Sequence, residues 1–356
     1  MIRATKIGLV SVAILGLSFF RASAQTLPDF KAMTLEAVQK SIPLIQKGAT
    51  GFSANTKCVS CHNQSLPQMT MAVARIRGFV IDEKQAKAQD VKVYEALLQA
   101  KPLFQAAPKS KAAESALDNN LVDPAMTVGY LMAGMASSQQ KSDGLTGLIA
   151  QYVAQKQDVS GRWSVHTARP PMEASEFAAT SLNVRALKTY APSSPETEAR
   201  ITKARTWLLA NKPRNTEDKA FRLFGLGWTN ADKTAISKAI EDLLSDQRDD
   251  GGWSQLPNMT SDAYATGEAL VALYEAGKMS VTASAYNRGR FFLLTTQAMD
   301  GSWSVPKRAI SVQGYVETGY PYENAQYISI GGACWATIAL MYSVEGPDLK
   351  PSAAKL

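Results

Sequence analysis

One spacing, Gln-x-x-x-Gly-x-Trp-Ser, occurs three times in this chain and constrains its fold more than any other feature. The copies begin at Gln157, Gln247 and Gln297, and a helical pattern precedes each of them. The glycine lets the chain turn sharply after a helix end, and the tryptophan can stack back on that helix. A unit that recurs in this way indicates a repeat fold, in which each unit buries its apolar face against its neighbours.

Weaker copies extend the repeat over the rest of the chain. Near the start, Gln46 is followed by Phe52 at the tryptophan offset, and a helix over residues 201–211 keeps Trp207 without the Gly-x-Trp. We therefore count six helix pairs rather than three, with about 50 residues in each pair.

The two helices of each pair differ in composition. Small, apolar helices, expected on the inside, cover residues 66–79, 124–137, 175–190, 218–228, 262–276 and 332–342. Helices richer in Lys, Arg, Glu and Gln, expected on the outside, cover residues 35–46, 83–100, 144–157, 196–211, 231–247 and 283–297. Outer helices with a solvent-exposed face and inner helices that are buried are typical of two concentric layers. The sequence predicts an all-α fold, an (α/α)6 toroid of six inner/outer pairs, with an open solenoid as the alternative.

The first residues have the three regions of a secretory signal. Arg3 and Lys6 precede an apolar run over residues 7–20, and Ala22-Ser23-Ala24 provides a small-x-small cleavage site. The run is shorter than the roughly 20 residues of a bilayer span, so we expect cleavage rather than an anchor, and no membrane span afterwards. We therefore expect residues 1–24 to be a signal peptide, residues 25–356 to be a single toroid domain, and the protein to be in a bacterial periplasm.

Charge limits the partners that this chain can have. Because the signal segment carries three basic residues and no acidic one, the net charge falls from +7 to +4 after cleavage. A value this small, without a long basic run, does not indicate nucleic acid. It is compatible with docking to an acidic redox partner protein.

The run Cys58-Val59-Ser60-Cys61-His62 has the spacing of a c-type haem attachment site. The two thiols would form thioethers with the porphyrin, and His62 would be the proximal iron ligand. A thiol redox pair or half of a zinc site are the alternatives, but the chain has only one further Cys, Cys334, and one further His, His166. The expected export favours one covalent haem c, held by a loop at about residues 50–65.

The sixth iron ligand has several candidates. The repeat register puts His166 in the connection equivalent to that of His62, which makes it the first candidate. Met69, Met71 and Met172 are thioether alternatives and would raise the reduction potential. An open sixth position is a further alternative.

Two other segments bear on this site. Arg169, on the His166 connection, could pair with a haem propionate. The long last connection, residues 298–331, contains four tyrosines and could cover a cavity or the haem edge, although it could equally only seal the rim.

The Gln-x-x-x-Gly-x-Trp turns resemble the repeats of the squalene–hopene cyclase and prenyltransferase superfamily of α/α toroids. With the Cys-x-x-Cys-His turn, and with the segments at residues 169–173 and 319–329, the chain resembles a subgroup of secreted bacterial proteins that carry a c-type haem motif. The resemblance implies a toroid with a cavity suited to an apolar, isoprenoid-like molecule.

The catalytic residues that the resemblance implies are not found. The Asp-x-Asp-Asp acid of the cyclases has its nearest counterpart in Glu173-Ala174-Ser175-Glu176, and the prenyltransferase zinc ligands do not occur together. We therefore expect a haem protein for electron transfer, or for redox or ligand sensing. The alternatives are a haem-dependent oxidoreductase or cyclase-like enzyme for an apolar substrate, and an isoprenoid- or peptide-binding toroid with a structural haem.

Overall fold

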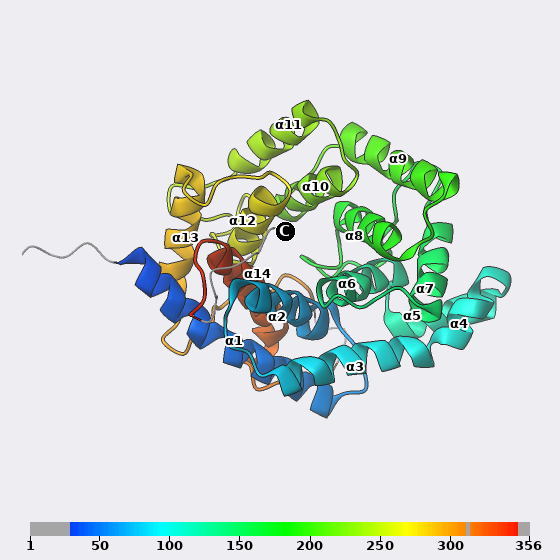
Figure 1. Cartoon of the computed structure of the whole chain (residues 1–356), viewed down its shortest axis with the longest axis horizontal. Coiled ribbons are helices and arrows are strands. Elements are labelled where there is room, and N and C mark those ends of the chain that lie inside the picture. Colours follow the sequence, from blue (N-terminus) through cyan, green and yellow to red (C-terminus); the bar gives the residue numbers. More distant parts are fainter. Residues whose placement is uncertain (1–28, 311–313, 348–356) are drawn as a thin grey trace, which may run out of the picture.

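A computed structural model describes residues 29–310 and 314–347 of the chain. Over these residues the protein is helical, with fourteen α-helices and one isolated antiparallel bridge (Figure 1). None of the described helices combines the length and the apolar character that a bilayer span requires. The predicted signal peptide, residues 1–24, lies outside the described residues.

Six helices form a ring around the centre of the molecule (Figure 1). Each packs against the next, and the last packs against the first, so that the ring closes. They are α2 (Leu66–Arg77), α6 (Pro124–Ser137), α8 (Glu176–Tyr190), α10 (Thr216–Trp228), α12 (Ala263–Glu275) and α14 (Gln326–Tyr342).

A second layer surrounds this ring. It contains α1 (Phe30–Asn55), α3 (Glu83–Gln99), α7 (Gly144–Gln155), α9 (Pro195–Ala210), α11 (Lys233–Leu244) and α13 (Ser284–Thr296). The predicted all-α toroid class is confirmed, and the open solenoid is not what the chain forms. The sequence did not predict α4 (Lys101–Ala106) and α5 (Lys111–Leu121), which enlarge the outer layer between α3 and α6.

Short polar side chains begin many of these helices. Asp143 accepts hydrogen bonds from the backbone N–H groups of Leu145 and Thr146 at the start of α7, and the Thr146 hydroxyl accepts one from the Asp143 backbone. Ser175 caps α8 in the same manner through the N–H of Ala178. Such caps satisfy backbone donors that have no partner in the first helical turn.

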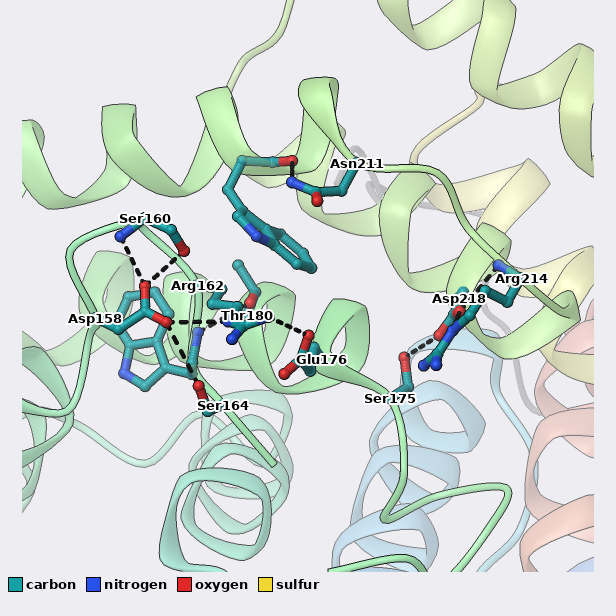
Figure 2. A network of polar contacts seen from close by, with 12 residues as sticks. Asp158, Ser160, Arg162, Ser164, Ser175, Glu176, Thr180, Asn211, Arg214 and Asp218 are labelled. Atoms are coloured by element: carbon teal, nitrogen blue, oxygen red, sulfur yellow. Dashed lines mark hydrogen bonds and ion pairs between the residues drawn. The ribbon is translucent and has the colours of Figure 1, made fainter. Parts of the chain in front are cut away.

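The three repeated turns share one set of contacts. Each tryptophan is buried, and its indole N–H donates to a backbone carbonyl ten residues earlier, on the preceding outer helix. The pairs are Trp163 with Val153, Trp253 with Leu243 and Trp303 with Leu293, at 2.7, 2.8 and 2.9 Å. Figure 2 shows the first of these turns, where Ser160 and Arg162 contact Asp158 and Arg162 also reaches Glu176. The tryptophan therefore stacks back on the helix before it, as the spacing predicts.

The glutamine of each turn joins neighbouring repeats. Its side-chain amide donates to the carbonyl of the turn glycine and to a carbonyl of the next outer helix, which is Arg200, Ala285 or Ala37. The turn glycines have φ between 87° and 99°, a left-handed conformation that favours glycine. The last of these contacts, from Gln297 after α13 to Ala37 of α1, joins the last outer helix to the first and closes the outer layer.

The Gln297→Ala variant is expected to lower the free energy of unfolding by about 1–3 kcal/mol. The amide donates to the carbonyls of Ala37 and Gly301, both at 3.0 Å, and alanine removes both hydrogen bonds. Urea unfolding followed by circular dichroism measures the loss. The control is Gln99→Ala at the exposed end of α3, which should change the stability by less than about 0.5 kcal/mol. Equal urea midpoints for the two variants would contradict the proposed role of Gln297.

Candidate functional site

The Cys-x-x-Cys-His run lies between the end of α1 and the start of α2, where its own side chains fold it. The Ser60 hydroxyl accepts a hydrogen bond from the Asn63 backbone N–H at 3.0 Å and starts a wide, π-type helical turn over Cys61–Ser65. Gln64 accepts from the Ser60 backbone and donates to Ser53 of α1. This turn leads directly into α2, so the position of His62 is tied to two helices.

The three residues of the motif have different surroundings. Cys58 is exposed, whereas Cys61 is buried, and its thiol donates to Glu173 Oε1 at 3.9 Å. Burial, together with the negative charge of Glu173, raises the pKa of the Cys61 thiol. Burial and the positive charge of Arg169 lower the pKa of His62 to about 3, so its imidazole is neutral. A neutral imidazole is the form that binds a metal.

His62 borders a cavity of about 180 Å³, which we call the rim pocket. Three segments far apart in the sequence line it, and each lies in or beside a connection from an outer to an inner helix. They contribute Phe52, His62 and Asn63, then Arg169, Pro170, Pro171, Met172 and Glu173, then Ala309, Ile310, Gly314, Tyr315, Val316, Thr318, Glu323, Asn324, Gln326, Tyr327 and Ile328. The fold thus brings His62 of the motif, but not Cys58 or Cys61, to a pocket shared with two other segments that the sequence analysis singled out.

Aromatic rings hold the imidazole of His62 on two sides. The ring centroids of Tyr327 and Phe52 lie 5.5 and 6.4 Å from it, both in edge-to-face arrangements. No hydrogen bond to either ring nitrogen of His62 occurs within the described residues. The orientation of the ring is therefore set by packing, and its nitrogens remain available.

Arg169 and Glu173 form the polar part of the wall. Their backbones exchange two hydrogen bonds of 3.1 Å and their side chains form an ion pair, so the Pro170–Pro171 segment projects as a tight turn with a cis peptide bond. Burial raises the pKa of Glu173. Within the described part of the chain, Arg169 Nε and the Tyr327 hydroxyl are buried without a hydrogen-bond partner. These two unsatisfied groups offer donors to a ligand with acceptor oxygens.

The other predicted iron ligands lie in different places. Met172 is buried and lines the rim pocket with His62. Met69 and Met71 are buried on α2 outside the pocket lining, and His166 is exposed, with its backbone N–H bonded to Asp123 at 2.6 Å. The structure therefore brings Met172 to the pocket of His62 and leaves His166, the first candidate by repeat register, outside its lining.

The described residues show neither a cluster of zinc ligands nor a free carboxyl group at the segment nearest to the cyclase acid motif. In residues 29–310 and 314–347, no three His, Cys, Asp or Glu side chains gather as metal ligands, and Cys334 is buried on α14. The carboxyl groups expected near the cyclase acid are separately engaged, Glu173 by Arg169 and Glu176 by Arg162.

A buried pair of acids was missed at the sequence level. Glu217 of α10 and Glu268 of α12 are 4% and 0% exposed and affect each other's pKa. The sequence does contain one sign of this pair, because Glu268 is the one charged residue within the apolar stretch from Ala263 to Tyr274.

Comparisons with known proteins support the fold. No family model matches the chain. A terpene cyclase/mutase of Nectria sp. is 29% identical over 119 residues, which are 33% of this chain, and the chain spans only 15% of that protein's length. The solved type II terpene cyclase MstE from Scytonema matches 88% of this chain and 99% of its own, with a TM-score of 0.53 and 12% identity. A variant of that enzyme in complex with geranylgeranyl dihydroxybenzoate matches with a TM-score of 0.51, also at 12% identity, over 88% of this chain and 98% of its own. At this identity the likeness shows a shared cyclase-like toroid.

Proposed function

We propose that the chain is an exported haem c protein on a cyclase-like toroid and serves electron transfer or redox sensing. Cys58 and Cys61 would hold one haem by thioether bonds, and His62 would be its proximal ligand. The observation that carries the proposal is that His62, whose neutral imidazole has unbonded nitrogens, borders the rim pocket.

Of the motif residues that would hold this group, His62 lines the rim pocket, whereas Cys58 and Cys61 lie outside its lining. The other residues of the rim pocket suit a haem in several respects. A bound haem supplies an iron that exchanges one electron, and the protein sets its potential and access. Phe52 and Tyr327 orient the imidazole, and Pro170 to Met172 provide an apolar wall that limits water. Arg169 Nε and the Tyr327 hydroxyl, both unsatisfied, are donors that fit carboxylate groups such as propionates.

The position of the motif favours electron exchange with another protein. Cys58 is exposed, and the side chains of Ile310 and Tyr315 at the pocket are 85% and 53% exposed. Exposed apolar side chains beside a redox group are suited to brief contact with a partner protein. We propose a periplasmic redox partner for this face.

A second candidate function is the binding of an apolar small molecule in the same pocket. Its support is the largely apolar wall formed by Pro170, Pro171, Met172 and Ile328. In that case, the purified protein would carry an organic ligand and no covalent haem.

The deciding experiment is the absorption spectrum and the mass of the protein produced with c-type haem maturation. A Soret band and a chain mass increased by one haem are expected. We further propose Met172, which lines the rim pocket with His62, as the sixth ligand. Met172→Ala is then expected to alter the low-spin spectrum and to lower the reduction potential, because loss of a thioether ligand removes its stabilisation of ferrous iron. His166→Ala is the matched control and should leave both unchanged. No covalent haem in the wild type rejects the proposal, whereas an effect of His166→Ala alone would transfer the sixth ligand to that residue.

A further inference from the structure

Buried acids lie between two neighbouring inner helices, away from the rim pocket. Glu217 belongs to the first turn of α10, and Glu268 belongs to the middle of α12, which packs against α10. Tyr264 of α12 and Tyr130 of α6 are also fully buried and interact electrostatically with both carboxyl groups.

The polar atoms of this cluster have no conventional partners. Within the described residues, none of the four carboxyl oxygens of Glu217 and Glu268 has a partner in good hydrogen-bond geometry, nor do the hydroxyls of Tyr130 and Tyr264. Glu217 nevertheless lies close enough to Glu268 and Tyr264 for weak hydrogen bonding within the cluster to affect their pKa values. The indole N–H of Trp335 on α14 is also unpaired. Two ionised carboxylates have acceptors only, so no hydrogen bond can form between them until one carries a proton.

Few positive charges are available to balance these acids. The other charged groups that affect them are Asp218 of α10, Asp262 at the start of α12, and Arg308 in the last connection. Asp218 already contacts Ser175 and Arg214 (Figure 2), and Asp262 contacts Ala265 and Gln255. No cation of the neighbouring inner helices α6, α8 and α14 is among the groups that shift the pKa of Glu217 or Glu268. Arg308 is the one positive charge among those groups.

If both Glu217 and Glu268 were ionised, two neighbouring negative charges would lie in the buried core, with the partly buried Arg308 as their counter-charge. Burying an unpaired charge is costly, and two carboxyl groups in one site share a proton instead. We propose that the buried pair on α10 and α12 is a proton-binding site in which Glu217 and Glu268 hold at least one proton between them. The proposal does not depend on the bound haem.

The shared proton would connect stability to pH. Burial raises the pKa of Glu217 from 4.5 to about 8, and burial beside Glu217 raises that of Glu268. The folded chain then retains a proton that the unfolded chain releases above about pH 4.5. The stabilisation is complete below that pH and is lost as the pH rises towards 8, because the unfolding equilibrium constant increases about tenfold per pH unit for one such proton. Above this window, repulsion would separate α10 from α12.

Urea unfolding of the wild type, Glu217→Gln and Glu268→Gln at pH 5, 6, 7 and 8 tests the proposal. Glutamine cannot ionise and can donate to the remaining carboxyl group. In the variants, the rise in the unfolding constant between pH 5 and 8 should be smaller than in the wild type by up to about a thousandfold. Glu241→Gln on the exposed face of α11 is the control and should keep the wild-type pH dependence. If both core variants also keep it, the shared proton is ruled out.

A measurement without core variants covers the case in which they do not fold. Infrared spectra of the wild type should contain a protonated carboxyl band near neutral pH that disappears on unfolding. Because burial also raises the pKa of Glu173, and raises that of Asp262 to about 6, the spectra are recorded at pH 7.5 and repeated with Glu173→Gln, which should retain the band. Absence of the band from that variant at pH 7.5 overturns the proposal, whatever the haem content of the preparation.

Discussion

Replacing Cys58 and Cys61 together by alanine is expected to reduce covalent haem from about one per chain to none. Both thioether bonds depend on these sulfur atoms, and the remaining His62 would hold haem only by coordination, which denaturation reverses. Mass spectrometry of the denatured chain and haem staining after denaturing electrophoresis measure the loss. Each single variant should retain haem through one thioether, in lower yield.

The matched control for the cysteine variants is Cys334→Ala. This third cysteine is fully buried on α14 and does not line the rim pocket, so haem attachment should be unchanged. Far-ultraviolet circular dichroism verifies that the double variant remains helical, since Cys61 is also buried. Covalent haem on the double variant would show that the motif is not the attachment site.

The Trp253→Ala variant is expected to lose about 3–5 kcal/mol of stability, the largest loss that we expect from a single substitution in the repeats. The indole is fully buried, donates to Leu243 at 2.8 Å, and lies over the glycine at position 289 of α13. Alanine leaves a cavity between two repeats and a carbonyl without its donor. The loss is measured by urea unfolding at fixed pH.

Trp253→Phe separates the two contributions. Phenylalanine keeps most of the buried volume and removes the indole N–H, so we expect a smaller loss, of about 1–2 kcal/mol. Equal losses in the two variants would indicate that packing of the ring contributes little. An unchanged urea midpoint in Trp253→Ala would contradict the idea that these turns join the repeats.

Local pattern was sufficient to predict most helices, but not all of their limits. The last inner helix was expected over residues 332–342, with its start at Gly332. The helix begins at Gln326 instead and runs through Gly331 and Gly332. A Cβ atom on Gly332 would lie 2.6 Å from Val305, so the small residue serves close packing rather than a turn. Propensity alone cannot separate these two uses of glycine.

The candidate site residues were likewise predictable only where the signal lies in a short stretch of sequence. The motif around His62 was visible because its spacing is local, and its chemistry as a haem site stays a prediction. The register argument for His166 correctly assigned it to an outer-to-inner connection, but it could not tell which side chain of that connection faces the pocket. Met172 lines the pocket, six residues further on. A tight turn between Arg169 and Glu173 causes this difference, because it directs the intervening side chains inward.

The sequence by itself determined the all-α class, the helix pairs, the repeated turns and the cysteine–histidine motif. Each of these depends on residues within one or two helical turns of each other, where spacing alone decides which side chains meet. Only the tertiary structure decided that His62, Met172 and Tyr327 share a pocket, and that Glu217 faces Glu268. Those contacts join segments from 51 to 265 residues apart, and they form because the closed ring packs helices against distant neighbours. Since packing depends on the shape of the whole core, no local pattern could reveal them.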